Sequence, residues 1–208
     1  MKPNWSFSSK LDAMKNIALK DTRLAVIKAA QDIFARFGYK KTTVDDIARA
    51  AHKVKSTIYQ YFESKEQIFQ TIVEKESQIL KEEIRKAIKA QDNPKKKLLT
   101  YVITRIRVLK DLSNFHNALR DEYLEHFVFI EKIRKKYLKD EINTIKKILK
   151  NGVDQGTFVI NDLELTACMI VVALKGLEYP LIEEIEVLSN EQGIDSLLGV
   201  LFSGIEKR

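Results

Sequence analysis

Residues 43–62 read TVDDIARAAHKVKSTIYQYF, and this stretch decides the fold. Thr43, with Asp46 three residues later, is typical of a helix N-terminus. Small or apolar side chains then recur on one face of the predicted helix, at Val44, Ile47, Ala48 and Ala51. The residues from His52 to Val54 are too few for anything but a turn, and a second short helix is predicted from Lys55 to Phe62. Two short helices joined by such a turn are typical of a helix-turn-helix.

The residues on both sides of this stretch also show the capping residues and apolar spacing of helices. Asp21 or Thr22 can cap a preceding helix that ends before Gly38, where a left-handed C-cap favours glycine. The apolar positions of that helix follow helical spacing at Val26, Ala30, Ile33, Phe34 and Phe37. On the other side, Ser64 and Gln67 form a capping box that starts another helix at Lys65. The sequence therefore predicts three helices and the beginning of a fourth.

The helix predicted from Lys55 to Phe62 has an apolar and a polar side. The core-facing positions are expected at Val54, Ile58, Tyr61 and Phe62. The outward positions are expected to be Lys55, Ser56, Tyr59 and Gln60, with Thr57 on the flank. Lysine suits phosphate or guanine, glutamine suits adenine, and hydroxyl groups suit phosphate oxygens. The alternative interpretation is an ordinary amphipathic helix with a solvated polar face.

The net charge of the chain is concentrated near its beginning. Residues 1–65 hold 13 Lys and Arg residues against 6 Asp and Glu residues, a net charge of +7. Residues 66–208 hold 23 charged residues of each sign and are neutral. Phosphate-driven binding needs such a positive field, whereas a structural helical cap does not. The charge distribution therefore favours DNA binding over the solvated-face interpretation.

Residues 22–75 resemble the N-terminal DNA-binding domain of TetR-family transcription regulators. The resemblance is carried by Ile27, Ala30, Phe34, Gly38-Tyr39, Thr42-Thr43, Ile47-Ala48, Thr57 to Phe62 and Ser64-Lys65-Glu66. It implies that Thr43 caps a helix and touches phosphate, and that Lys65 reaches phosphate although its charge opposes the helix dipole. The DNA-binding residues that it implies are Thr42, Thr43, Lys53, Lys55, Ser56, Thr57, Tyr59, Gln60, Tyr61 and Lys65.

One departure from the family pattern lies in the turn. Family members usually have Gly-Val-Ser where this chain has His52-Lys53-Val54. Histidine adopts a left-handed conformation more readily than most other non-glycine residues. Val54 is left at the position of the missing capping serine, unless Ser56 starts the helix later. Lys53 is expected to lay its stem over the core and its charge toward phosphate.

The composition predicts an all-α protein. The chain has 208 residues with only 3 Pro and 7 Gly, and its best strand candidate, residues 157–160, is short. The single cysteine, Cys168, excludes an intramolecular disulfide and fits a reducing compartment. The beginning lacks a signal-peptide core, and the longest apolar run, residues 167–174, is far below the ~20 residues that cross a bilayer. We therefore expect a cytoplasmic protein without membrane contacts.

Three parts of the chain are predicted. They are a basic extension at residues 1–20, a helix-turn-helix DNA-binding domain at 21–66, and a helical effector-binding and dimerisation domain at 67–208. The extension carries a net charge of +3. It is either a basic arm that lies on DNA, or a tail or peripheral helix packed by Trp5 and Phe7.

The larger domain is predicted to consist of helices at 65–89, 94–110, 113–125 and 129–150, then a turn at Asn151-Gly152 and Gly156. A further helix starting at Asn161 is apolar on almost every face and must be covered. The last helix, at 191–205, has a broad apolar stripe. The resemblance implies that these two helices form a homodimer interface, and an intrachain core is the alternative. The interface candidates are Leu174, Leu177, Ile194, Leu197, Leu198, Leu201, Phe202 and Ile205.

The resemblance also implies an effector pocket in the larger domain. A small hydrophobic or amphipathic molecule is the ligand class expected there. The alternative for these side chains is ordinary core packing. The candidates are aromatic, apolar and polar side chains at Tyr101, Ile103, Phe115, His116, Leu119, Tyr123, His126, Phe127 and Met169.

Metal and catalytic patterns are weak. His116, Glu122 and His126 are the only grouping of residue types that bind metals. Glu122 and His126 stand four residues apart on one helical face, but they lack a firm third ligand. The sequence has no Gly-rich phosphate loop, nucleophile elbow or Cys-x-x-Cys motif. We therefore predict no metal site, no cofactor and no enzymatic activity.

The expected function is that of a homodimeric repressor, released by a small molecule from a near-palindromic DNA operator. Two other classes stay open. One is a DNA-binding nucleoid or cell-division factor of the same fold without an effector. The other is a helical scaffold whose basic end touches an acidic membrane or protein.

Overall fold

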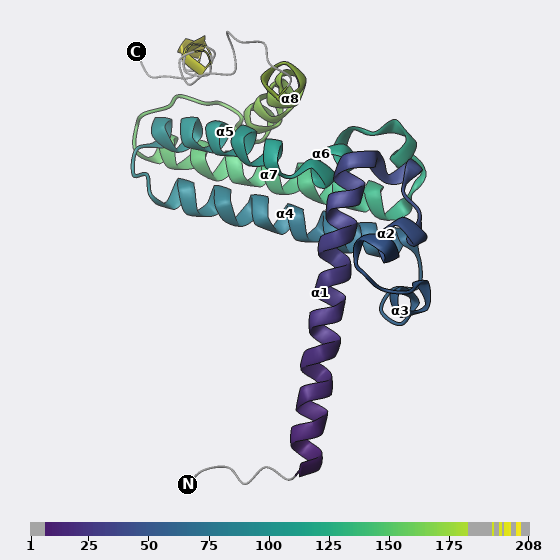
Figure 1. Ribbon diagram of the computed structural model, residues 1–208. Coiled ribbons are helices and arrows are strands. Elements are labelled where there is room, and N and C mark those ends of the chain that lie inside the picture. Colours follow the sequence, from purple (N-terminus) through teal and green to yellow (C-terminus); the bar gives the residue numbers. More distant parts are fainter. Residues whose placement is uncertain (1–6, 183–192, 194–195, 197, 201–202, 205–208) are drawn as a thin grey trace, which may run out of the picture. The chain divides into compact units, whose positions relative to one another are not determined.

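The protein is all-α in the part that the structure describes. This computed structural model describes residues 7–182, Gly193, Ser196, 198–200 and 203–204, and within them no strand element occurs (Figure 1). The elements are α1 (Phe7–Lys41), α2 (Val44–Ala50), α3 (Lys55–Tyr59), α4 (Lys65–Lys89), α5 (Pro94–Asp111), α6 (Ser113–Arg120), the 3-10 helix η1 (Glu122–His126), α7 (Val128–Asp154) and α8 (Leu163–Ile182).

Two compact units make up the chain. We call Met1–Glu74 the head and Lys75–Arg208 the body. The division falls inside α4, whereas the sequence predicted it between residues 66 and 67. One continuous helix therefore contributes residues to both units.

The core of the head is built by the helix-turn-helix together with α1 and the first turns of α4. Phe34 lies at its centre, with ring centroids 5.8 Å from Tyr39 and 5.0 Å from Phe69. Phe34 and Phe69 meet edge to face, a geometry that aromatic pairs favour. The other buried apolar side chains among the described residues of the head are those of Val26, Ile27, Ala30, Ile47, Ala48, Ala51, Ile58, Phe62, Ile68, Ile72 and Val73.

Helix α1 differs from the prediction at its start and agrees with it at Gly38. It begins at Phe7, so Asp21 and Thr22 lie inside the helix and cap nothing. Gly38 has φ 76° and ψ 163° and interrupts the helical geometry as the sequence predicts. That backbone conformation is nearly restricted to glycine because a Cβ atom would clash there. Phe37 was predicted to be a core residue, but half of its surface is exposed.

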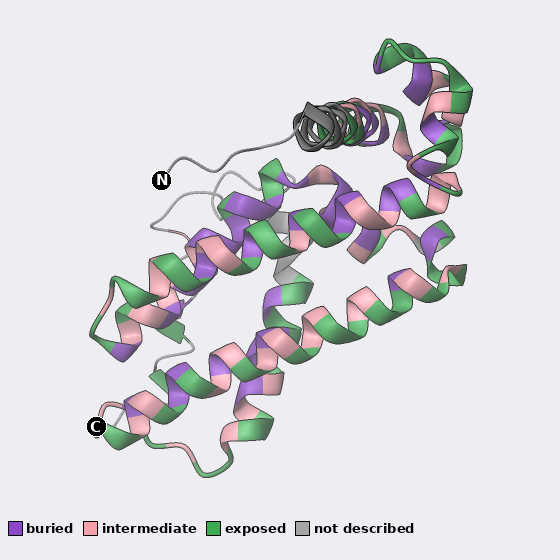
Figure 2. Cartoon of the chain, turned by 90° about the horizontal axis from the view of Figure 1, so that it is seen from below, coloured by how far each residue is buried: buried purple, intermediate pink, exposed green. Residues whose placement is uncertain are grey.

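The body is a bundle in which α7 packs against α5 and α8, and α6 packs against α5 and α7. Buried and exposed residues alternate along these helices, as Figure 2 shows. The buried apolar residues include Leu98, Tyr101, Val102, Leu109, Phe115, Ile145, Leu149 and Ala167. No helix in the described part of the chain is long and apolar enough to span a membrane.

Two predicted boundaries in the body are wrong. The predicted helix at 113–125 breaks at Asp121, whose side chain accepts the backbone N–H of Tyr123 at 2.9 Å and starts η1. The predicted turn at Asn151-Gly152 is helical, because α7 continues to Asp154 and the chain turns at Gly156 with φ 69°. Gly152 instead allows the ring of Phe158 to approach the backbone of α7 closely, since a Cβ added at Gly152 would lie 2.0 Å from Cδ2 of Phe158.

Candidate nucleic-acid interface

The start of α2 is fixed by the predicted cap at Thr43. Thr43 Oγ1 donates to Asp46 Oδ2 at 2.6 Å and accepts the backbone N–H of Asp46 at 3.2 Å. The backbone N–H of Thr43 donates to the same carboxylate at 3.0 Å, which completes a capping box. These hydrogen bonds lower the pKa of Asp46. Thr43 is exposed at the start of α2, but its hydroxyl already serves the cap.

Thr42, predicted as a DNA contact, lies in the core of the head. It is 2% exposed, and its hydroxyl donates to the carbonyl of Gly38 at 2.8 Å. A side chain enclosed in this way supports the bend after α1. The structure therefore removes Thr42 from the surface that could meet DNA.

The turn between α2 and α3 confirms the expectation for His52. Its φ is 53°, so a histidine takes the left-handed conformation that usually favours glycine. The backbone N–H of Lys53 donates to the carbonyl of Ala48 at 2.9 Å and closes the end of α2. Val54 occupies the N-cap of α3, where it makes no side-chain hydrogen bond.

Helix α3 presents most of the predicted groove-facing residues to solvent. Ile58 and Phe62 are buried, as expected. Val54 was predicted to face the core but is 67% exposed, which adds an apolar side chain to the surface. The helix also ends at Tyr59, so Gln60 is its C-cap and not part of its interior. The exposed residues are Lys53, Lys55, Ser56, Tyr59 and Gln60, with Thr57 and Tyr61 half-buried.

Lys55 and Asp45 form an ion pair that links α3 to α2. The Nζ atom of Lys55 lies 2.8 Å from Oδ2 of Asp45. The hydrogen bond to this carboxylate raises the pKa of Lys55. Both side chains are about half exposed, so solvent screening keeps the pair weak. Lys55 is therefore available to another anion once it leaves Asp45.

Lys65 has a structural role that the sequence did not reveal. Its Nζ donates to the carbonyls of Tyr39 and Thr42, both at 3.0 Å, and lies 4.2 Å from the centroid of the Tyr39 ring. Burial lowers its pKa. Two of its three N–H groups thus hold the segment between α1 and α2 in place. At most one N–H remains for the predicted phosphate contact.

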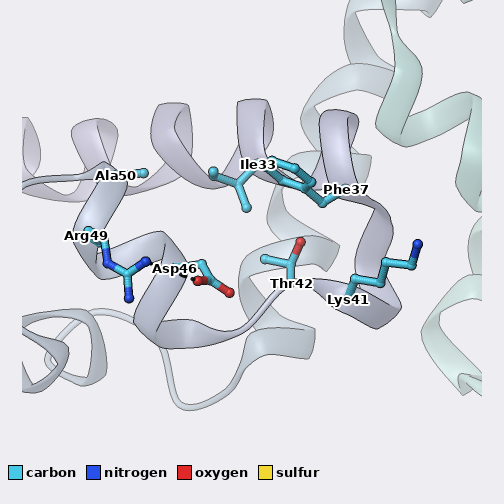
Figure 3. Close-up of a pocket in the computed structure, with 7 residues that line it drawn as sticks. All are labelled: Ile33, Phe37, Lys41, Thr42, Asp46, Arg49 and Ala50. Atoms are coloured by element: carbon cyan, nitrogen blue, oxygen red, sulfur yellow. Dashed lines mark ion pairs between the residues drawn. The ribbon is translucent and has the colours of Figure 1, made fainter.

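The head also has an open hollow of about 400 Å³ between the end of α1 and α2 (Figure 3). Ile33, Phe37 and Ala50 supply its apolar part. The remaining lining residues are Lys41, Thr42, Asp46 and Arg49. None of the residues of α3 line it, so it is separate from the exposed face of α3.

The predicted pocket residues differ widely in their burial. Tyr101 and Phe115 are buried, and His116, Leu119 and Phe127 are half-buried. Tyr123 and His126 are exposed on η1, and Met169 is 63% exposed on α8. The Phe115 ring stands perpendicular to that of Tyr137, with centroids 5.1 Å apart. Among the described residues, no three His, Cys, Asp or Glu side chains gather as metal ligands.

A buried polar cluster lies beside Tyr101, and sequence reasoning missed it. Glu141 Oε1 accepts from the hydroxyl of Tyr101 at 2.8 Å and from Nε of Arg105 at 2.5 Å. Arg105 and Glu141 are only 1% and 4% exposed. Burial raises the pKa of Tyr101 well above its usual range. Charged residues at helical spacing usually lie on a solvated face, so the sequence carried no signal that these two are enclosed.

The predicted dimer residues are only partly described. Leu174 and Leu198 are buried within the chain, at 5% and 2% exposure. The side chain of Leu177 and all of Ile194, Leu197, Leu201, Phe202 and Ile205 lie outside the described residues. A different apolar stripe is exposed on α8. It consists of Leu165, Met169 and Val172, at 57%, 63% and 60% exposure and at i, i+4 and i+7.

The head corresponds to a known family. Residues 26–72 match the bacterial regulatory proteins of the tetR family. The chain is 27% identical over 155 residues to the uncharacterized HTH-type transcriptional regulator YhgD of Bacillus subtilis (strain 168), covering 73% of this chain and 79% of that protein. It is 28% identical over 161 residues to the "Probable acrEF/envCD operon repressor" of Escherichia coli (strain K12), covering 74% and 72%.

The similarity extends over the body in solved structures. The transcriptional regulator FadR from Bacillus subtilis, in complex with stearoyl-CoA, superimposes with a TM-score of 0.70 at 25% identity. The match covers 88% of this chain and 99% of that chain. Both units therefore have the helical architecture of these regulators.

Proposed function

We propose that this chain, a TetR-family transcriptional regulator, represses transcription as a homodimer that a small molecule releases from its operator. The observation that carries the proposal is the exposed polar face of α3 on a head whose residues 1–65 have a net charge of +7. A helix with such a face fits a major groove, and the charge supplies attraction to phosphate. The name of the similar operon repressor supports repression over activation.

In the proposed complex, Lys55, Ser56, Thr57 and Gln60 face base edges or adjacent phosphates, and Tyr59 and Tyr61 contact the DNA backbone. Lys53 and Thr43 lie nearest the phosphates that flank the groove. Val54 joins this set because it is exposed at the start of α3, where an apolar side chain can meet a thymine methyl group. Two heads of a dimer would read half-sites about 34–36 Å apart.

Gln60→Ala is expected to change sequence preference. A bidentate contact from glutamine to adenine contributes about 1–3 kcal/mol of discrimination at one base pair, whereas loss of Tyr59 should weaken binding to every sequence alike. The measurement is fluorescence anisotropy on a duplex selected from a random library and on its single-base variants. An equal loss on all duplexes for Gln60→Ala would refute the base-reading role.

Two other outcomes would favour the alternative functions. Many scattered sites in genomic footprinting would favour a nucleoid factor, and no binding of the protein to DNA at low salt would favour a helical scaffold.

Met169→Glu is expected to convert a dimer into a monomer. The stripe of Leu165, Met169 and Val172 is exposed in the part of the chain that the structure describes, and a two-fold related copy of α8 would cover it. The new carboxylate at the centre of this stripe would be buried and unpaired in the dimer, so it should weaken association by roughly 3–5 kcal/mol. Sedimentation at micromolar concentration checks this, with Lys175→Gln, which also lowers the net charge by one, as the control elsewhere on α8. A wild-type monomer would contradict the dimer.

The similarity to FadR suggests an effector with a long acyl chain. That protein was crystallised with stearoyl-CoA, and the body of this chain has the same helical architecture. Stearoyl-CoA is therefore the first compound to test, by thermal shift and by release of the selected duplex. A ligand at 100 times its Kd stabilises a folded protein by about 2.7 kcal/mol. Stabilisation of the protein without release of DNA would argue against regulation by this compound.

A further inference from the structure

Exposed lysines form a row along α7. Four of them stand at i, i+4, i+7 and i+15, a spacing that puts them on one side of a helix with 3.6 residues per turn. Asn143 lies between the last two on the same side and is also exposed. We call this row the lysine stripe, and it consists of Lys132, Lys136, Lys139 and Lys147, all of them exposed.

Lysines next to the stripe have acidic partners in the chain. The Nζ atom of Lys135 lies 2.6 Å from Oε1 of Glu131, and that of Lys150 lies 2.9 Å from Oδ2 of Asp154. Within the part of the chain that the structure describes, no such partner pairs with the four lysines of the stripe. Like charges three or four residues apart destabilise a helix. The stripe therefore does not stabilise α7, and an anionic partner would relieve its repulsion.

Charge is also segregated along the sequence of α7. Residues 132–150 hold eight Lys and Arg residues against two acidic ones. One of those two, Glu141, is buried, and the other, Asp140, pairs with Lys81 of α4 at 3.2 Å. Solvated helix faces usually carry charges of both signs, at spacings that allow pairing. The stripe lacks that alternation, which favours a binding surface over a merely solvated face.

The chemistry of the stripe favours phosphate groups as its partner. A helix that binds in a membrane surface needs an apolar face, and protein interfaces are depleted in lysine and depend on aromatic or arginine side chains. The stripe consists of lysines with Asn143 between them, and both residue types contact DNA phosphates. Its length is about 22 Å along the helix axis, which is the rise of about six base pairs. A regular polyanion of that length is duplex DNA.

We infer that the lysine stripe of α7 is a second DNA-contacting surface, which holds the phosphate backbone of duplex DNA without reading its sequence. The inference goes beyond the proposed function, which places the DNA contacts in the head. Lysines that face phosphates release the cations condensed on the duplex, so the stripe adds affinity for any sequence and makes binding more sensitive to salt. Sequence preference still comes from contacts to base edges.

Lysine labelling of the full-length protein is the first test. An acetylating reagent modifies exposed lysines, and mass spectrometry measures the rate at each one, with and without a random-sequence duplex of about 40 base pairs, longer than two half-sites. The duplex should slow labelling of all four lysines of the stripe by about fivefold or more, because phosphate contacts enclose their amino groups. Lys86 of α4 and Lys110 of α5 are exposed outside the stripe and should keep their rates.

Four labelling results would overturn the inference. Unchanged rates in the stripe would show a solvated face, and equal protection of Lys86 and Lys110 would show unspecific coating of the protein. Slow labelling of the stripe before DNA is added would show that another part of the chain, or a second copy, already covers it. Protection by phosphatidylglycerol vesicles but not by DNA would make the surface a membrane contact.

The same labelling experiment separates this inference from the proposed function. Lys53 and Lys55 report on the head, whose α3 is proposed to enter the major groove. Protection of Lys53 and Lys55 without the stripe would leave the proposed function standing and overturn the inference. Protection of the stripe without these two lysines would support the inference and count against DNA binding by the head.

Salt dependence is the second test. The stripe variant replaces the four lysines of the stripe by glutamine. The control variant replaces by glutamine four exposed lysines of α4 and α5, which are Lys86, Lys89, Lys96 and Lys110. Each variant loses four charges, and glutamine favours a helix about as well as lysine does. Both variants are made together with Tyr59→Ala, which is expected to weaken binding by the head, and both are compared with Tyr59→Ala alone.

The stripe variant should bind the random-sequence duplex with a slope of log K against log salt that is less steep by about 3–4, because each phosphate contact contributes about 0.9. The control variant should keep the slope of Tyr59→Ala alone. An equal change in the two variants would show that only net charge matters, and no change in the stripe variant would show that its lysines do not meet phosphates. Either result would overturn the inference. Thermal melts check that both variants are folded.

Discussion

Replacing Arg105 with alanine should lower the free energy of unfolding by about 3–5 kcal/mol. The change leaves Glu141, 4% exposed, without its guanidinium partner at 2.5 Å. A buried carboxylate without a counter-charge is strongly unfavourable, and the hydroxyl of Tyr101 is then its remaining partner on α5. Urea denaturation measures the effect, because a shift of the midpoint at constant slope reports stability.

Two further variants separate this cost from simple truncation of a long side chain. Arg85→Ala breaks an exposed pair with Glu82, in which both side chains are at least 40% exposed. Exposed pairs contribute about 0–1 kcal/mol, so little change is expected. The double variant Arg105→Met with Glu141→Leu removes both charges at similar volume and should be close to neutral or stabilising. A loss for the double variant as large as for Arg105→Ala would show that packing, and not the unpaired charge, dominates.

Gly152→Ala should destabilise the protein by about 3 kcal/mol, at the upper end for overpacked cores. The new methyl group would lie 2.0 Å from Cδ2 and 2.4 Å from Cε2 of Phe158. Phe158 is 2% exposed and cannot move into solvent without loss of its burial. The opposite sign would be expected from helix propensity alone, because alanine favours a helix interior by about 1 kcal/mol over glycine.

Gly176→Ala is the control for this prediction, since Gly176 is also in a helix and has no atom within 4 Å of an added Cβ. It should be neutral or slightly stabilising. A thermal melt of both variants decides the matter. If Gly152→Ala is as stable as the wild type, the contact between α7 and Phe158 is looser than its geometry indicates.

Local signals in the sequence predicted the head well. The capping box of Thr43 and Asp46, the positive φ at Gly38 and the burial of Ile58 each follow from a pattern within a few residues. The resemblance then placed those elements in a known DNA-binding domain. The sequence could not predict which hydrogen bonds an individual side chain makes. Lys65 has the sequence position of a phosphate ligand, yet two carbonyls take most of its hydrogen-bonding capacity.

The body was predictable in its helices and less so in its interior. Apolar spacing located α4, α5 and α8 closely, but it could not tell which charged residues are enclosed. Glu76, Arg105 and Glu141 are 1%, 1% and 4% exposed although they stand among many solvated charges of the same kinds. Their burial depends on helices that meet from distant parts of the chain. The break at Asp121 was equally hidden, because this one residue ends α6 through its backbone N–H and starts η1 through its side chain.

The pair of Lys55 and Asp45 gives the protein a counterion of its own. If Lys55 leaves Asp45 for a phosphate, the freed carboxylate attracts a cation, which offsets part of the cation release from the DNA. This residue is therefore expected to add less to the salt dependence of affinity than an unpaired lysine would. Asp45 also competes with every phosphate on arbitrary DNA. In the proposed complex, only a site that offers Lys55 a better acceptor wins that exchange, so we expect the pair to reduce adhesion to the bulk of the chromosome.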